Sequence, residues 1–196
     1  MRVRVKVLWI AISLALLFPT CAFGPDSSQR VGADFIVTAA PVYVPLAELR
    51  GEERFPKGAQ LLLVHEGKAE PLVQGFAATA DANVYFDGKL VLFTGKQNVG
   101  DPWQIWELTL QDRSVRKVIA TETDAERPFY SPGGRMVWAQ RTPHGFELTS
   151  AEDGHQLKYP FLNPTAAPGL LPLTYTQTNA FPADVLKDGR ILFEAG

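Results

Sequence analysis

The side chains best suited to acid–base or metal chemistry are scattered along this sequence of 196 residues. The three histidines, His65, His144 and His155, do not pair with one another at the spacing of metal ligands. There is one cysteine, and there is no His-Glu-x-x-His pattern, Gly-x-Ser-x-Gly elbow or phosphate-binding loop. We therefore expect the histidines at surface or turn positions, and we expect no catalytic residue, metal or other cofactor in this chain.

An acidic run at residues 122–126 (ETDAE) is the nearest approach to a cation site. It lacks the central glycine and the distal glutamate of an EF-hand loop, and its alternation is short. We therefore expect this run to be a solvated loop.

Two tryptophans stand close together in residues 101–106 (DPWQIW). In a strand, alternation places Trp106 on the face opposite Trp103 and Ile105. An indole here is suited to lining a binding surface, and packing inside the fold is the alternative role. Trp103 and Trp106 are the candidate binding residues of the sequence.

The N-terminus has the pattern of a secretory signal peptide. A basic head at residues 1–6 (MRVRVK) precedes twelve mostly apolar residues at 7–18 and a small-residue end at 19–24 (PTCAFG). Twelve residues are too short to cross a bilayer comfortably, which disfavours a membrane anchor. We predict a signal peptide at 1–22 with cleavage after Ala22, a polar linker at 23–33, and a periplasmic or secreted protein.

Cys21 offers an alternative to that cleavage, because a lipoprotein signal also ends at a cysteine. The residues before it, Phe18-Pro19-Thr20, match a lipoprotein box poorly. The alternative localisation is thus a lipoprotein anchored at Cys21. Cleavage after Ala22 would instead remove the only cysteine, leaving no disulfide within the mature chain.

The composition is that of a folded domain, with 46% hydrophobic and 20% charged residues. The formal net charge of −2 does not indicate a nucleic-acid partner. Contact with a membrane is expected only through a lipid on Cys21.

Short β-like runs separated by Gly, Pro and Asp turns fill the rest of the chain. Residues 45–54 (PLAELRGEER) are expected to be a loop or a single helical turn, and residues 163–173 (NPTAAPGLLPL) an irregular insertion. The runs are 34–40 (DFIVTAA), 61–65 (LLLVH), 83–86 (NVYF), 90–94 (LVLFT), 105–110 (IWELTL) and 115–119 (VRKVI).

One pattern recurs three times: a strand, a glycine-containing turn, a basic residue and a second apolar strand. The copies are 84–93 (VYFDGKLVLF), 129–139 (FYSPGGRMVWA) and 184–193 (DVLKDGRILF). Their turn glycines, Gly88, Gly134 and Gly189, lie 46 and 55 residues apart. Glycine tolerates the positive φ of a two-residue hairpin turn, and we expect the basic residue to point to solvent.

A second hairpin follows the first at residues 105–119 and again at 146–159, and residues 61–73 form a similar hairpin. Two hairpins in about 45 residues give four strands per repeat, which is typical of propeller blades. A β-sandwich with unrelated hairpins is the alternative. We predict an all-β fold, a β-propeller of four-stranded blades at residues 34–196.

Residues 128–138 (PFYSPGGRMVW) resemble the TolB-like (WD-like) propeller repeat, whose core reads roughly Pro-x-Phe-Ser-Pro-Asp-Gly-Lys-x-Ile-x-Phe. The segment departs at Gly133, where the family usually has Asp. The copies around Gly88 and Gly189 keep the Asp and lack the Ser-Pro. The resemblance covers about residues 61–196 and implies a fold, because these positions build the blade and carry no chemistry.

A closed propeller needs at least four blades. The sequence predicts three to four, about three and a half. We therefore expect an incomplete propeller, from a truncated reading frame or from a segment of a longer parent.

Two functions follow from the resemblance. TolB-like proteins are periplasmic and act through protein contacts, which implies an exported, non-catalytic propeller that binds a protein or a cell-envelope component. Similar propellers also precede the hydrolase domain of prolyl-oligopeptidase-like enzymes. The alternative is therefore the N-terminal propeller portion of a larger hydrolase whose catalytic domain is absent from this chain.

Overall fold

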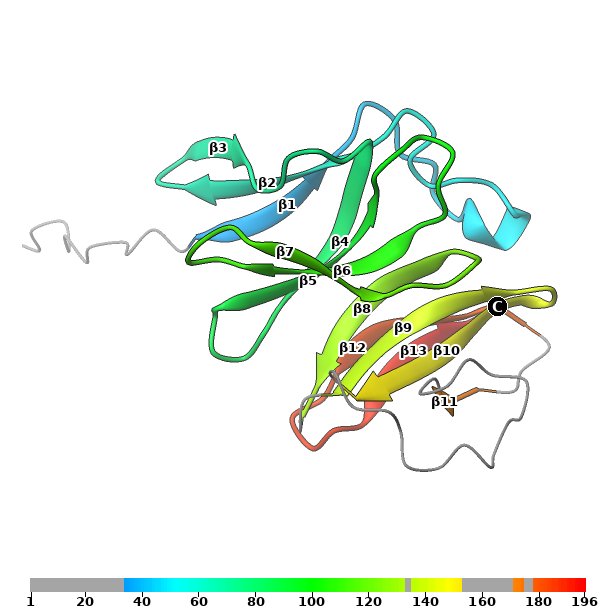
Figure 1. Cartoon of the computed structure of the whole chain (residues 1–196). Helices are drawn as coiled ribbons and strands as arrows, with labels where there is room; N and C mark the ends of the chain where they lie inside the picture. Colours follow the sequence, from blue (N-terminus) through cyan, green and yellow to red (C-terminus); the bar gives the residue numbers. More distant parts are fainter. Residues whose placement is uncertain (1–33, 133–134, 153–170, 175–177) are drawn as a thin grey trace, which may run out of the picture. The chain divides into compact units, whose positions relative to one another are not determined.

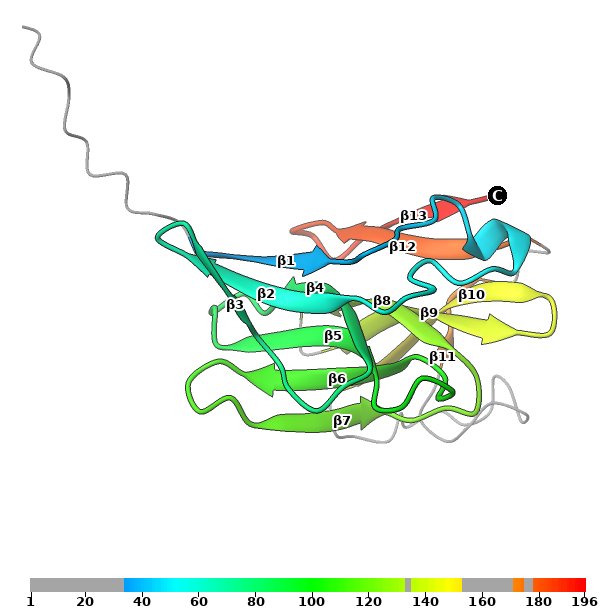
Figure 2. The same cartoon turned by 90° about the horizontal axis from the view of Figure 1, so that it is seen from above.

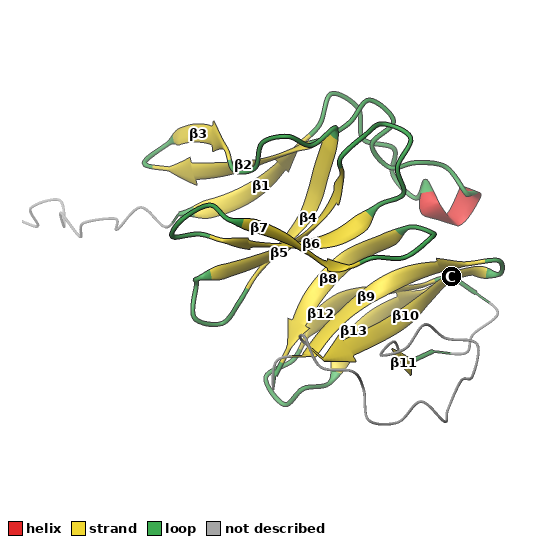
Figure 3. Cartoon of the chain, in the orientation of Figure 1, coloured by secondary structure: helices red, strands yellow, loops and turns green. Residues whose placement is uncertain are grey.

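The computed structural model describes residues 34–132, 135–152, 171–174 and 178–196. Within these ranges the chain forms thirteen β-strands and one turn of 3₁₀ helix (Figures 1 and 3). The all-β prediction is confirmed. No helix in the described ranges has the length and apolar character needed to span a bilayer. The predicted signal peptide, the linker and Gly134 lie outside the described residues.

The strands form four antiparallel sheets, which we name blades I to IV. Blades II and III are four-stranded meanders, as the repeat predicts, whereas three strands are described in blade I and two in blade IV (Figure 2). Blade I is β1 (Phe35–Ala39), β2 (Gln60–His65) and β3 (Lys68–Pro71); blade II is β4 (Ala78–Val84), β5 (Leu90–Lys96), β6 (Gln104–Thr109) and β7 (Val115–Ile119); blade III is β8 (Ala125–Ser131), β9 (Arg135–Thr142), β10 (Gly145–Glu152) and β11 (Leu171–Pro172); blade IV is β12 (Ala180–Val185) and β13 (Ile191–Ala195).

Each blade packs its first strand against the preceding blade. β4 contacts β1 and β2, β8 contacts β4, β5 and β6, and β12 contacts β8, β9 and β10. The core therefore lies in layers between sheets, and the middle sheets are covered on both faces. That coverage explains why the central residues of β5 (Val91–Thr94) and of β9 (Met136–Ala139) are all buried, with side chains of both faces covered.

Alternation along β5 and β9 divides their side chains between two such layers. Val91 and Phe93 pack with blade I residues, while Leu92 packs with Trp138 of β9. Val137 of β9 turns the other way, onto Ala180 of blade IV. The same strand position thus faces the following blade in each repeat.

The repeated turns are longer than the two residues expected. In the β4–β5 turn, Gly88 N donates to Tyr85 O at 2.9 Å, and Tyr85 N donates to Leu90 O at 2.8 Å. In the β12–β13 turn, Gly189 N donates to Leu186 O at 2.8 Å. Both glycines adopt positive φ, 73° and 85°, which confirms that the turns need glycine for its backbone conformation. The basic residues that follow are exposed, as predicted.

The fourth strand of blade III differs from the expectation. The hairpin strand predicted near residue 156 lies outside the described residues, and Leu171–Pro172 pair with β10 instead. These two residues belong to a stretch expected to be irregular. Proline is tolerated here because β11 is an edge strand, where the missing N–H costs no ladder hydrogen bond.

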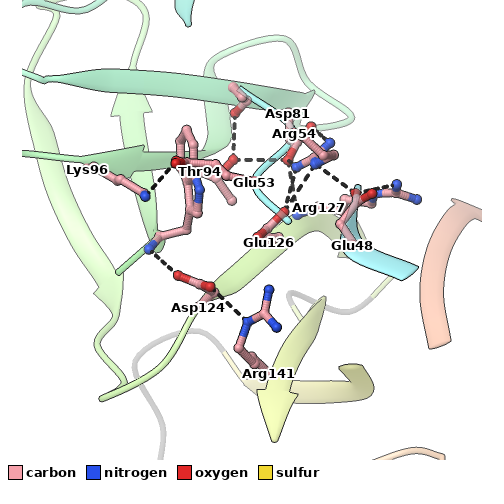
Figure 4. Close-up of polar contacts among 12 residues, drawn as sticks. Glu48, Glu53, Arg54, Asp81, Thr94, Lys96, Asp124, Glu126, Arg127 and Arg141 are labelled. Carbon is pink, nitrogen blue, oxygen red and sulfur yellow. Dashed lines mark hydrogen bonds and ion pairs between the residues drawn. The ribbon is translucent and has the colours of Figure 1, made fainter. Parts of the chain in front are cut away.

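A long connection joins β1 to β2 within blade I. We call residues 40–59 the strap; it contains the 3₁₀ turn η1 (Glu48–Arg50), which ends at Gly51 with φ 70°. This confirms the expected loop or single helical turn. The first strands of blades II and III are bulged near Asp81 and Arg127, which adopt φ 55° and 52°. A bulge changes the direction in which a side chain points. Here Asp81 points toward Arg54 of the strap, and Arg127 points toward Glu48 of the strap (Figure 4).

Candidate binding groove and buried ion cluster

A groove of about 290 Å³ opens on blade II, where β5 and β6 are joined and β7 ends. Trp106 of β6 forms part of its wall, and Gln104, two residues earlier in the same strand, also lines the groove. Residues lining the groove include Gly95, Gln97, Asp101, Gln104, Trp106 and Lys117. The groove is therefore bounded by one indole, one ammonium group, two side-chain amides and one carboxylate.

Short-range contacts fix the indole of Trp106. Its Nε1–H donates to Gly95 O at 3.1 Å, and the ring of Phe76 meets it edge-on with centroids 4.8 Å apart. A Cβ on Gly95 would lie 2.9 Å from the Phe76 ring, so this position requires glycine. The wall of the groove is thus held in place before any ligand arrives.

The rim is fixed by side-chain hydrogen bonds to the backbone. Gln104 Nε2 donates to Trp103 O at 2.9 Å, and Gln104 Oε1 accepts from Thr121 N at 2.8 Å. Asp101 Oδ2 accepts from both Asn98 N and Asn98 Nδ2, at 2.9 and 3.0 Å. These side chains position the loops, and most of their polar atoms already make hydrogen bonds within the protein.

Lys117 differs from these engaged groups. Its Nζ lies 4.8 Å from the centroid of the Trp106 ring, and its side chain is exposed. Its ammonium has no ion pair with any carboxylate in the described part of the chain. An ammonium beside an indole suits a ligand that carries an anionic group next to a flat apolar part.

Trp103 lies elsewhere, in a small apolar cluster rather than in the groove. Its ring is 3% exposed and meets Phe55 of the strap edge-on, with centroids 6.3 Å apart. Ala59 of the strap and Ala78 and Ala80 of β4 complete the cluster. The structure therefore separates the two predicted tryptophans: Trp106 lines a groove, and Trp103 is covered by the strap.

A buried ion cluster ties the strap to blades II and III (Figure 4). The guanidinium of Arg54, in the strap, lies 2.8 Å from the carboxylate of Glu48 and 2.8 Å from that of Glu126 in β8. It also donates two hydrogen bonds to the carboxylate of Asp81 in β4. Arg127 Nη2 donates to Glu48 Oε1 at 2.7 Å. Thr94 Oγ1 donates to Asp81 Oδ2 at 3.1 Å.

The cluster holds three carboxylates and two guanidinium groups, so its formal charge is negative when all five groups are ionised. Burial raises the pKa of Glu126 to about 7; Arg54 opposes this shift, and Asp81 and Asp124 add to it. Burial also acts to raise the pKa of Asp81, but the charge and hydrogen bonds of Arg54 outweigh it and hold that pKa below its usual value. Glu126 therefore gains or loses its proton near neutral pH.

Sequence reasoning missed this cluster. Residues 122–126 were expected to be a solvated loop, yet Glu126 lies in β8 and is 4% exposed. Arg54 and Glu126 are 72 positions apart in the sequence, so local composition cannot predict the hydrogen bond between them. One hint in the sequence is that this run leads directly into Pro128-Phe129-Tyr130, where the repeated strand pattern begins.

The histidines match their expectation where they are described. His65 and His144 are exposed, and His155 lies outside the described residues. His65 Nδ1 is 2.6 Å from Asp34 Oδ1, and this hydrogen bond raises its pKa. No group of three or more His, Cys, Asp or Glu side chains in the described ranges is arranged to hold a metal ion.

No protein-family model matches the chain. Hydrazine synthase subunit alpha of Kuenenia stuttgartiensis is 27% identical over 147 residues, covering 63% of this chain and 18% of that protein. Among solved structures, Kuenenia stuttgartiensis hydrazine synthase has a TM-score of 0.63 at 17% identity, covering 82% of this chain and 27% of the other. TolB from Acinetobacter baumannii has a TM-score of 0.52 at 19% identity, covering 82% and 37%.

These likenesses support a TolB-like β-propeller fold. The described sheets are consistent with part of such a propeller, as predicted. The chain spans 18% of the length of its curated relative and at most 37% of these two structures. At such identities the likeness is one of fold, and it carries no activity or partner to this chain.

Proposed function

We propose that this chain is an exported, non-catalytic β-propeller that binds a protein or a cell-envelope component through the groove at Trp106. The observation that carries the proposal is a preformed groove with a fixed indole and an ammonium that makes no ion pair with the described residues. Sites on a rigid sheet scaffold are suited to recognition, because little ordering is needed when the partner binds. The basic and apolar N-terminal pattern supports export to the periplasm.

The first prediction concerns Lys117. Reversing its charge with Lys117→Glu should weaken capture of an anionic partner group, and site-specific photocrosslinking from Gln97 at the groove measures that capture. We expect the crosslinked adduct to fall by at least about fivefold. Lys89→Glu, in an exposed turn of the same blade, is the matched control and should leave the adduct unchanged.

A crosslinker at Lys187, in the β12–β13 turn, tests whether the contact is confined to the groove. An equal adduct from Lys187, or an adduct at Gln97 that Lys117→Glu does not alter, contradicts the proposed site. Intact mass of the exported protein then distinguishes cleavage after Ala22 from a lipid on Cys21.

A second candidate is the propeller segment of a larger enzyme. The curated relative favours it, since the matching region is only 18% of hydrazine synthase subunit alpha. For a prolyl-oligopeptidase-like parent, the genomic sequence beyond codon 196 would encode a Gly-x-Ser-x-Gly segment with a later Asp and His. A stop codon there favours the non-catalytic protein.

A further inference from the structure

We propose that the strap, residues 40–59, is a proton-operated lid over Trp103, latched by the buried ion cluster of Arg54, Glu48, Asp81, Glu126 and Arg127. Its closed state hides a small apolar surface made by Trp103 and β4. This lid is separate from the groove at Trp106, and it does not depend on the proposed partner.

The strap is held to the sheets mainly by side chains. Its backbone hydrogen bonds in the described structure close on the strap itself, as in Val44 N to Arg54 O at 2.9 Å and Glu52 N to Ala47 O at 2.8 Å. The exception lies at its end, where Thr79 N donates to Ala59 O. A segment with self-contained backbone bonds can separate from the sheets as a unit.

Two sets of side-chain contacts hold the lid closed. Phe55 lies edge-on against Trp103, and the Tyr43 ring packs at a tilt against Phe55 with centroids 5.7 Å apart. Glu53 pairs with Lys96 at 2.7 Å, and Lys96 lies 5.0 Å from the Trp103 ring. The ion cluster is the second set, and it is the more buried of the two.

The charge of the cluster makes the latch sensitive to protons. With Glu126 protonated, two carboxylates balance two guanidinium groups; with Glu126 ionised, one negative charge is left over in a buried site. The charged groups around Glu126 come from the strap, β4, β8, the residue just before β8, and β9. They are Arg54, Glu48, Asp81, Asp124, Arg127 and Arg141, of which Arg141 pairs with Asp124 at 2.9 Å. Glu194 of β13 approaches Arg127 at 3.9 Å.

The direction of the pH effect follows from the pKa of Glu126, which burial raises to about 7 in the closed state. Burial has a larger effect on this pKa than the opposing charge of Arg54. Opening the strap would admit water to the carboxyl and remove Arg54, so the pKa falls back toward the usual value of 4.5. Protonated Glu126 therefore stabilises the closed state. This contribution is fully present below pH 4.5 and is lost as the pH rises through 7. We therefore expect the strap to be closed in acid and to open more often above neutrality.

Hydrogen–deuterium exchange of the full chain at pH 5.5 and pH 8.5 tests this lid. After correction for the intrinsic exchange rate, amides of the strap should exchange on the order of tenfold faster at pH 8.5. Amides of β5 should not change. Equal protection of the strap at both pH values, or equal loss of protection in β5, overturns the proposal.

Glu126→Gln removes the titrating proton and keeps the shape of the side chain. This variant should exchange its strap amides at the same corrected rate at both pH values, while Glu53→Gln, which alters an exposed pair, should keep the pH dependence. Acrylamide quenching of tryptophan fluorescence supplies a second readout: it should rise with pH in the wild-type chain and not in Trp103→Phe. A pH dependence that survives Glu126→Gln also overturns the proposal.

Discussion

Arg54 is buried and contacts three carboxylates that come from three separate parts of the chain. Removing one member of such a group leaves the remaining charges without compensation in a dry site. Arg50, four residues earlier, makes an ion pair of similar length with Glu52 at the surface, where water solvates both groups. Burial, rather than the distance between the atoms, decides how much each arginine contributes to stability.

This contrast yields a prediction. Arg54→Met should lower the free energy of unfolding by about 3–5 kcal/mol, because Asp81, Glu48 and Glu126 lose their common partner. Arg50→Met should leave the urea midpoint nearly unchanged. Urea titrations of both variants at one pH provide the test, and similar midpoints for the two variants would contradict this account.

At the scale of elements, the first hairpins of blades II and IV depend on their turns. Gly88 and Gly189 both adopt positive φ, and a Cβ built on either would meet no neighbouring atom. The need for glycine at these turns is therefore one of backbone conformation alone. Gly100, also free of neighbours, has no such φ and serves as the matched comparison.

Gly88→Ala should therefore lower the free energy of unfolding by about 1 kcal/mol, since alanine is strained in the left-handed region. Gly100→Ala should leave stability unchanged or slightly higher, because it restricts only the unfolded chain. Thermal unfolding measures both. An equal loss in the two variants would indicate a packing effect instead.

These turns show which features the sequence could predict. The hairpins at Gly88 and Gly189 rest on residues next to one another in the chain, so glycine and alternation were sufficient to find them. The face of Trp106 followed from alternation too, but its contacts with Phe76, in the connection before β4, and with Gly95 of β5 involve other parts of the chain. The Arg54–Glu126 contact brings together distant residues, and no local pattern predicts it.

At the scale of the whole molecule, equivalent positions in blades II and IV differ in what covers them. Leu92 pairs with Asn83 just after the bulge of β4, and Leu192 pairs with Asp184 just after the bulge of β12. Leu92 is fully buried against blade III, whereas Leu192 is 56% exposed. The neighbouring blade, not the residue type, determines the environment.

The matched pair of substitutions follows directly. Leu92→Ala should lower the free energy of unfolding by about 2–5 kcal/mol, through lost burial and the cavity left between blades II and III. Leu192→Ala should change it by no more than about 0.5 kcal/mol. Chemical denaturation distinguishes them, and a large loss in Leu192→Ala would show that its face is covered in solution.

The packing of each blade's first strand onto the preceding blade also sets an order for synthesis on the ribosome. β8 finds its docking surface in strands translated before it, and β12 does the same with blade III. Contacts between neighbours in the chain close early, and growth of the fold can follow translation one sheet at a time. An arrested nascent chain that exposes blades I to III should therefore already resist protease across blade II.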